Sequence, residues 1–295
     1  MGSAWSYSRP AYAAPSANNP PIYRAFLMPH FAFWAWPLPF VGSLYKIADA
    51  IDAIEQSLPF SQKNGHPVWR GTRNYNSVYN PQLRDKLLEK TSEAPWADVR
   101  ELQWSNTGVG SEEKKLAINS LKIEDFCRYK YLLYTEGITY SGRFHFLQMC
   151  KSVILTPPIV WMQHTTHLVR PLFSSDLNLS DGKYSTGKTW QPSEGENRAW
   201  PKHYQPEEAN IVFVSPDWSD LENTIKWLEA HAGIAEKIAN RQRELWVNRG
   251  YLSPAAETCY WRELIRGWSR VVQIEDEAWE EQEEMSWEMF SMKYT

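Results

Sequence analysis

The residues best placed for chemistry lie in one stretch, 126–155, which reads FCRYKYLLYTEGITYSGRFHFLQMCKSVIL. An apolar strand pattern over 130–134 runs into a Glu-Gly turn, a Ser-Gly-Arg step opens a short helix over 142–150, and a second apolar run covers 152–155. This order and size are those of one βαβ unit. Arg143 falls in the first helical turn, where free backbone N–H groups and the helix dipole favour a phosphate. The pattern leaves open an ordinary crossover with an exposed arginine.

A second glycine loop follows another strand pattern. The sequence HPVWR at 66–70 predicts a strand, the Gly-Thr-Arg step at 71–73 its exit loop, and 81–90 a short helix that carries Arg84 one turn in. A strand that ends in such a loop suits ligand binding at the carboxyl edge of an α/β sheet. The alternative is a solvated loop with two basic residues.

Strand and helix patterns alternate after residue 60, which predicts an α/β fold with a mostly parallel sheet and helices on both faces. Residues 91–120 are expected to be loop-rich, and 174–209 to be a long surface insertion. The remaining predictions are a strand over 211–214 and helices over 40–57, 161–170 (ended by Pro171), 219–249 (ended by Gly250) and 253–273.

Composition narrows the possible partners. The 295 residues suit one large domain or two smaller ones, and a net charge of −4 with a pI near 6.0 disfavours nucleic acid. No apolar run reaches about 18 residues, so no transmembrane helix is expected. The first residues lack the apolar core of a signal peptide. Most of the 16 Trp and 15 Tyr are assigned to packing, although such rings also stack on sugars and bases.

Several familiar motifs are absent. The sequence has no GxGxxG, Walker A, GxSxG or HExxH pattern, which disfavours a Rossmann oxidoreductase. Asp-x-Asp, the usual metal handle for sugar nucleotides, is also missing. His164 and His167 are spaced as a metal pair on a helix, but no Cys or carboxylate ligand set accompanies them, so no metal site is expected.

Seven segments together resemble glycosyltransferase family 90, which includes capsule-associated fungal proteins and animal protein O-glucosyltransferases. They occur in the family's order over residues 28–272: MPHFAFWAWP (28–37), PVWRGTR (67–73), NPQLRDKLL (80–88), FCRYKYLLYTEG (126–137), YSGRFHFLQMCKSVIL (140–155), ANIVFVSPDWSDL (209–221) and CYWREL (259–264).

The resemblance implies a GT-B architecture, in which two Rossmann-like domains face a cleft and the C-terminal one holds the nucleotide sugar. We expect this chain to hold the donor-binding domain, with the N-terminal domain largely missing, in a protein of the secretory pathway (ER or Golgi). The expected division is an irregular N-terminus (1–25), a remnant of the N-terminal domain with an interdomain helix (26–58), the nucleotide-sugar-binding domain (59–273) and an acidic tail (274–295).

The activity implied by the resemblance is metal-independent, inverting transfer of glucose or xylose from a UDP-sugar to a glycan or protein hydroxyl, with no cofactor. Arginine side chains would stabilise the charge that grows on the leaving diphosphate. The family's motifs place the donor phosphates near Thr72, Arg73 and Arg84, the diphosphate on Ser141 and Arg143, the nucleotide near Gly137 and Thr139, and a disulfide between Cys127 and Cys150.

The chain departs from the family in one respect. The family's general base is an aspartate well upstream of the FAFWAW segment, whereas the 27 residues before Met28 contain no Asp or Glu. Inverting displacement needs a base to take the acceptor's proton. The base is therefore unknown, and the alternative hypothesis is a truncated or catalytically inactive nucleotide-sugar-binding or partner protein. Cys259 is left without a partner, and in some family members this cysteine bridges to the N-terminal region.

Overall fold

A parallel six-stranded sheet forms the centre of the computed structural model, which describes residues 5–12, 25–34, 36, 41–104, 117–177, 179 and 190–272. The strand order is β5-β4-β6-β7-β10-β9. The strands are β4 (Val68–Gly71), β5 (Asp98–Glu101), β6 (Tyr131–Leu133), β7 (Val153–Thr156), β9 (Pro171–Phe173) and β10 (Ile211–Phe213).

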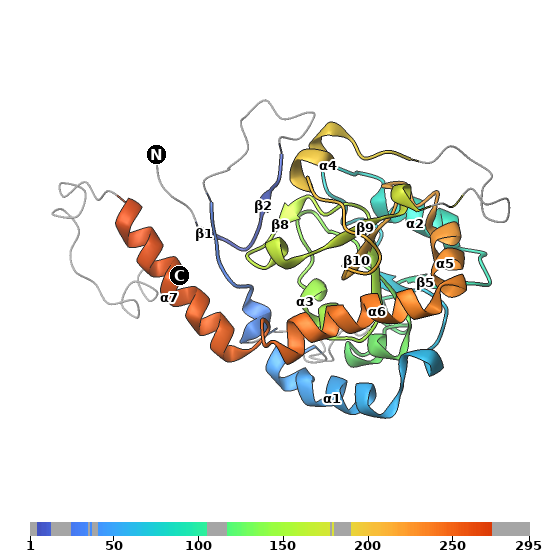
Figure 1. The fold of residues 1–295 in the computed structure, drawn as a ribbon, viewed down its shortest axis with the longest axis horizontal. Helices are drawn as coiled ribbons and strands as arrows, with labels where there is room; N and C mark the ends of the chain where they lie inside the picture. The colour runs from blue at the N-terminus through green and yellow to red at the C-terminus, as the bar shows by residue number, and fades with distance from the viewer. Residues whose placement is uncertain are drawn as a thin grey trace.

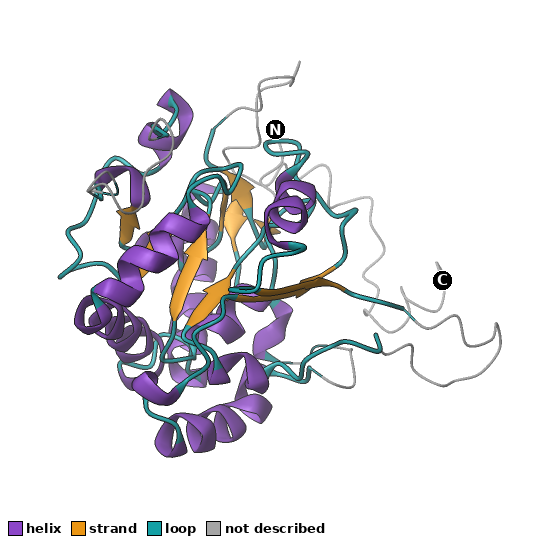
Figure 2. Ribbon diagram, turned by 90° about the vertical axis from the view of Figure 1, so that its right-hand side faces the viewer, coloured by secondary structure: helices purple, strands orange, loops and turns teal. Residues whose placement is uncertain are grey.

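Helices cover both faces of this sheet (Figure 2). Successive strand residues point to opposite faces, so Leu132 packs in one hydrophobic cluster and Leu133 in the other. The central strands β6, β7 and β10 are buried on both faces, which is why they read as continuous apolar runs. One cluster includes α1 (Leu44–Ser57) and α3 (Arg143–Gln148); the other includes α2 (Leu83–Thr91), α5 (Leu221–Ala230) and α6 (Ala232–Arg243). The predicted α/β fold with a parallel sheet is confirmed.

Short strands hold the N-terminal segment against the body. β1 (Trp5–Ser6) pairs in parallel with β3 (Phe26–Leu27), and β2 (Arg9–Pro10) pairs antiparallel with β8 (Trp161–Met162). Irregular structure was predicted over 1–25, so the short strands β1 and β2 differ from that prediction. The partner of β2 lies more than 100 residues away, which a local composition of Pro, Ala and Ser does not reveal.

The helix predicted over 161–170 is wrong. The structure has β8, a short 3-10 helix (Thr166–Leu168) and then β9, which begins at Pro171 rather than ending a helix there. β9 lies at the edge of the sheet beside β10, where a proline can be the first strand residue without removing a needed donor.

The single helix predicted over 219–249 is also wrong. It breaks at His231 into α5 and α6, and a π-helical turn (Glu244–Asn248) follows before Gly250 ends it at φ +72°. A straight helix of that length would run about 46 Å, whereas the strands of the sheet, of three or four residues, span only roughly 10–13 Å. The break and the π-turn let the segment follow the core, and the π-turn buries Trp246.

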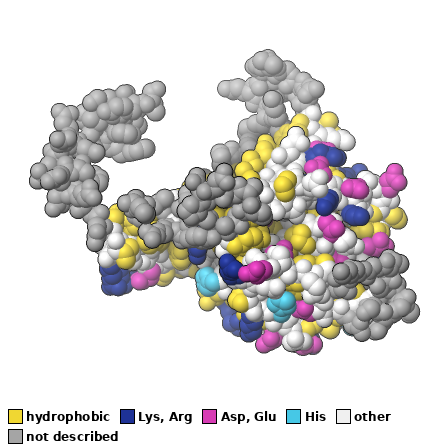
Figure 3. Space-filling view, turned by 90° about the horizontal axis from the view of Figure 1, so that it is seen from above, with side chains coloured by type: hydrophobic (Ala, Val, Ile, Leu, Met, Phe, Trp, Pro, Cys, Tyr) yellow, Lys and Arg dark blue, Asp and Glu magenta, His cyan; other side chains and the backbone are white. Residues whose placement is uncertain are grey.

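Three described elements lie in regions predicted as loops: β5 in 91–120, and a 3-10 helix (Ser174–Asp176) and α4 (Glu194–Ala199), with a capping box, in 174–209. The last described helix, α7 (Pro254–Val271), extends away from the sheet at the lower left of Figure 1, close to its predicted bounds. No helix among the described residues is long and apolar enough to cross a membrane. Acidic and basic side chains are interspersed on the face in Figure 3, in keeping with the net charge of −4.

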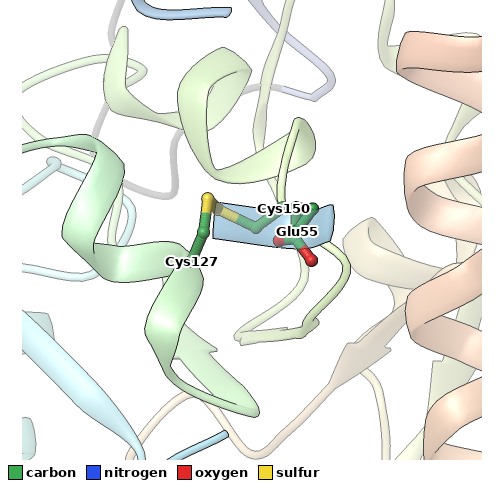
Figure 4. A group of neighbouring side chains, drawn as sticks. All are labelled: Glu55, Cys127 and Cys150. Atoms are coloured by element: carbon green, nitrogen blue, oxygen red, sulfur yellow. A yellow bond between two sulfur atoms is a disulfide. The ribbon is translucent and has the colours of Figure 1, made fainter. Parts of the chain in front are cut away.

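The predicted disulfide is confirmed. Cys127 and Cys150 are bonded and join the 3-10 helix Glu124–Arg128 to the end of α3 (Figure 4). Glu55 lies beside them, close enough for the three to resemble a metal site. The sulfurs are bonded to each other, however, and Glu55 Oε1 accepts hydrogen bonds from Lys63 Nζ at 2.8 Å and from the backbone N–H of Lys151 at 2.8 Å. This group is therefore a structural tie between α1 and the sheet.

Three buried histidines cluster at α3, which contributes His145. The ring centroids of His30 and His145 lie 6.2 Å apart, and those of His145 and His164 lie 6.0 Å apart. Burial lowers the pKa of His30 to about 4, that of His164 to about 3, and that of His145 well below 6.5. Neither ring nitrogen of His145 has a hydrogen-bond partner among the described residues. The cluster is therefore neutral in the folded protein at pH 7.

This cluster predicts loss of stability in mild acid. Below pH 6.5 the histidines are protonated in the unfolded chain and stay neutral in the folded protein. Each histidine therefore lowers the unfolding free energy by about 1.4 kcal/mol for every pH unit that the pH falls. The loss begins near pH 6.5 and continues down to the folded pKa. His145→Leu should show a shallower loss, by about 1.4 kcal/mol per pH unit, in urea unfolding between pH 6.5 and 5. Glu136, whose pKa is raised to about 8, acts in the opposite sense in both proteins and cancels in the comparison. Equal slopes would contradict the prediction.

Candidate functional site

The carboxyl ends of β4 and β6 form the topological switch point of the sheet. These strands are neighbours, but the chain leaves β4 for β5 on one side and leaves β6 for β7 on the other. Ligands in open α/β sheets bind at such points, beyond the carboxyl ends of the strands. A cavity of about 150 Å³ lies there, which we call the switch-point cavity; its walls include Thr72, Tyr75, Arg84, Thr135, Ser141 and Arg143.

Arg84 connects the two loops that form this cavity. It is the second residue of α2, and its guanidinium donates to the carbonyl oxygen of Thr72 (Nη1, 2.6 Å) and to that of Glu136 (Nη2, 3.1 Å). Thr72 follows β4, and Glu136 follows β6. The arginine is 8 % exposed, so its charge lies at the wall of the cavity rather than in bulk water.

Arg143 is the second arginine that lines this cavity. It is the first residue of α3, it donates through Nη1 to the carbonyl oxygen of Arg70, and its guanidinium carbon lies 5.4 Å from the ring centroid of Phe126. The preceding loop is fixed because the backbone N–H of Ser141 donates to the Tyr134 hydroxyl at 3.0 Å. The Ser-Gly-Arg step thus presents its arginine from a packed position.

The two cavity arginines carry uncompensated positive charge. Burial lowers the pKa of Arg84 to about 10, and burial together with the charges of Arg84 and Arg70 lowers that of Arg143 to about 10, so both remain protonated at pH 7. Arg70 is paired with Asp98 at 2.8 Å, whereas no carboxylate among the described residues pairs with Arg84 or Arg143. Two partly desolvated guanidinium groups without a counter-ion favour an anion.

The structure brings together four of the predicted site residues: Thr72, Arg84, Ser141 and Arg143 all line the cavity. Gly137 and Thr139 lie in the adjoining turn, where the backbone N–H of Gly137 donates to the Thr139 carbonyl at 2.8 Å, but they do not line it. The roles assigned to these residues stay predictions.

Arg73 lies outside the cavity. Its half-exposed side chain is 3.3 Å from both Asp85 and Glu101, so its charge is already paired. The motif placed Arg73 beside Thr72 in sequence, but the loop turns its side chain toward these two acids. Its predicted phosphate role therefore has less support than that of Arg143.

Sequence reasoning missed three residues of this region. Thr135 lines the cavity and accepts a hydrogen bond from Trp69 Nε1 at 3.1 Å, Glu136 follows it, and Tyr75 lies half exposed in the cavity wall. Thr135 and Glu136 immediately follow the predicted strand over 130–134, so their place at a strand's carboxyl end was the available signal. Tyr75 had no such signal.

A family model described as glycosyl transferase family 90 matches residues 19–174, more than half of the chain. The chain belongs to this family. The matched range contains the cavity residues from Trp69 to Arg143.

Known proteins of this family are similar over most of the chain. O-glucosyltransferase rumi of Drosophila melanogaster is 23% identical over 264 residues, which cover 86% of this chain and 53% of the relative. Protein O-glucosyltransferase 1 of Rattus norvegicus is 24% identical over 265 residues (84% and 54%), and the rumi homolog of Aedes aegypti is 27% identical over 231 residues (77% and 46%). The chain spans about half the length of these relatives.

The tight packing at Gly142 generates a prediction. A Cβ atom there would lie 2.6 Å from His30 Cε1 and 2.6 Å from Trp36 Cζ3, although the backbone is ordinary α-region. Gly142→Ala should therefore lower the unfolding free energy by about 1–3 kcal/mol through overpacking. Gly233→Ala is the matched control, since nothing lies within 4 Å of its added Cβ, and should be neutral or stabilising by up to about 1 kcal/mol. Equal urea midpoints for the two variants would refute this account.

Proposed function

We propose that this family 90 chain binds the diphosphate of a UDP-sugar in the switch-point cavity, as the donor site of a glycosyltransferase. The observation that carries the proposal is the pair of guanidinium groups, Arg84 and Arg143, that enter one cavity without a carboxylate partner among the described residues. Other anions would also be attracted to two positive charges. Family membership favours a nucleotide sugar among them.

The chemistry follows from the charges. As the bond between the sugar and the diphosphate breaks, negative charge grows on the leaving group, and forked guanidinium donors stabilise it. Because Arg84 is held by two carbonyl oxygens and Arg143 by a third, both are oriented before the donor arrives. Two positive charges in these positions supply what a metal ion supplies elsewhere, which supports a metal-independent reaction.

Tyr75 is the residue we assign to the nucleobase. Its ring lines the cavity and is 53 % exposed, and large exposed rings beside a phosphate site are suited to stacking on a base. The stacking would hold the uracil end of the donor while the arginines hold the diphosphate.

The transferred sugar and the acceptor are inferred from the relatives. The similar proteins are named O-glucosyltransferases, which favours transfer of glucose to a protein hydroxyl, with xylose and a glycan acceptor as the alternatives. Inversion at the anomeric carbon, a GT-B arrangement and a secretory-pathway location belong to the same proposal. The disulfide between Cys127 and Cys150 supports an oxidising compartment.

Calorimetry with UDP tests the donor site. Arg143→Ala should weaken UDP binding by about 10- to 100-fold, the size of a lost charge-assisted hydrogen bond. Arg143→Lys should recover only part of that loss because an ammonium lacks the fork. Arg73→Ala is the matched control and should change the Kd by less than about threefold, since its exposed charge is already paired. The proposal would be refuted if the unaltered chain did not bind UDP, or if Arg143→Ala and Arg73→Ala lost equal amounts of UDP affinity.

Turnover separates a transferase from a protein that only binds the donor. With UDP-glucose and a peptide or glycan acceptor, a transferase releases UDP and glycosylates the acceptor, and mass spectrometry detects both products. Excess EDTA should leave the rate unchanged, because the arginines neutralise the leaving group. A rate that disappears with EDTA and returns with a divalent cation would refute metal independence.

A further inference from the structure

A second, smaller cavity adjoins the switch-point cavity along the carboxyl edge of the sheet. Its volume is about 50 Å³, and its walls include Glu136 after β6, Thr156 at the end of β7 and Pro216 after β10. Thr135 lines the first cavity and Glu136 the second. Arg84 likewise lines the first cavity and its neighbour Leu83 the second, so the two cavities share a wall.

Glu136 offers a free polar atom to this second cavity. The residue is only 7 % exposed, and its Oε1 accepts hydrogen bonds from the backbone N–H groups of Val160 at 3.1 Å and Trp161 at 2.7 Å. Among the described residues no hydrogen bond reaches Oε2. Oε2 is not one of the fully buried unpaired atoms of the described residues, so a ligand group or water in the cavity can reach it.

The groups that face Glu136 leave it without a cation of its own. Burial raises the pKa of the Tyr12 and Tyr134 phenols, and the nearby Glu136 carboxylate raises both further, as Glu196 does for Tyr12. The Arg84 guanidinium hydrogen-bonds to the backbone carbonyl oxygen of Glu136 and not to its carboxyl group. Burial therefore raises the pKa of the Glu136 carboxyl to about 8 despite its two backbone hydrogen bonds. At pH 7 the group is mostly a neutral acid that can donate a hydrogen bond.

The volume limits what can enter. Because one water occupies about 30 Å³ in the liquid, a cavity of about 50 Å³ takes one or two hydroxyl-sized groups and not a whole sugar ring. Tyr12 and Asn80 add polar groups to the walls around the Glu136 carboxyl. Hydroxyl groups both donate and accept, which matches a wall of acid, phenol and amide.

We propose that the second cavity receives hydroxyl groups of the sugar carried on the diphosphate, and that Glu136 Oε2 hydrogen-bonds them. The inference rests on the proposed function and deepens it by assigning a residue to sugar recognition. Glu136 then contributes to the affinity for the sugar and not to the affinity for UDP alone.

The test compares the Kd values of UDP and UDP-glucose in one set of variants. The advantage of UDP-glucose is the Kd of UDP divided by the Kd of UDP-glucose. Glu136→Leu should leave the Kd of UDP unchanged and lower this ratio about tenfold, as the loss of one hydrogen bond would. Glu136→Gln retains a donor and an acceptor and should stay within about threefold of the unaltered chain at pH 7. Between pH 7 and 9 Glu136 loses its proton and with it the hydrogen-bond donor, so the advantage should change in the unaltered chain and stay level in Glu136→Gln.

The outcomes separate the two proposals. Suppose that UDP binds and that the advantage of UDP-glucose is the same in the unaltered chain and in Glu136→Leu. The second cavity then holds only water, so the inference is overturned while the proposed donor site stands. If no protein binds UDP, the donor site itself fails. Should Glu136→Leu not fold, the comparison of the unaltered chain with Glu136→Gln between pH 7 and 9 decides. An advantage that stays level over this pH range in the unaltered chain would then overturn the inference.

Discussion

The double hydrogen bond from Arg84 to the carbonyl oxygens of Thr72 and Glu136 is the contact on which the site depends. It joins the loop after β4 to the loop after β6, the two strands at which the chain changes direction in the sheet. Two further hydrogen bonds join β4 to the segment after β6, from Trp69 Nε1 to Thr135 and from Arg143 to the carbonyl oxygen of Arg70. Together with these contacts, the buried charge of Arg84 sets the shape of the switch-point cavity and, through the Glu136 backbone, the position of the carboxyl group in the neighbouring cavity.

The surrounding packing keeps that charge oriented and partly desolvated. His30 and Trp36, from the segment before α1, press on Gly142 and so hold the loop that leads into Arg143. The disulfide between Cys127 and Cys150 fixes the other end of α3. Segments that are distant in sequence thus meet behind one short helix, and the neutral histidines among them link the stability of this support to pH.

Elements with strong local patterns were predicted well. The apolar runs at β6, β7 and β10 and the amphipathic α1 are encoded by the spacing of their own residues, and the disulfide followed from family resemblance. Elements that depend on distant partners were not. β5 carries charged residues and forms by pairing with β4, and β9 starts at a proline that only an edge position allows. The break at His231 depends on the size of the sheet that the helices cover, and the sequence of the helix itself does not encode that size.

The sequence by itself determined that a strand, a glycine turn and Arg143 occur in order, and that Arg84 opens a helix after a second such loop. These are short-range facts, since each depends on neighbouring residues. The tertiary structure alone decided which arginines are free to bind an anion. Arg73 meets Asp85 and Glu101, whereas Arg84 and Arg143 meet backbone oxygens and no described carboxylate. Charge pairing and burial arise only when distant segments pack together, and for that reason the pairing of Arg73 and the neutral Glu136 carboxyl could not be read from the chain.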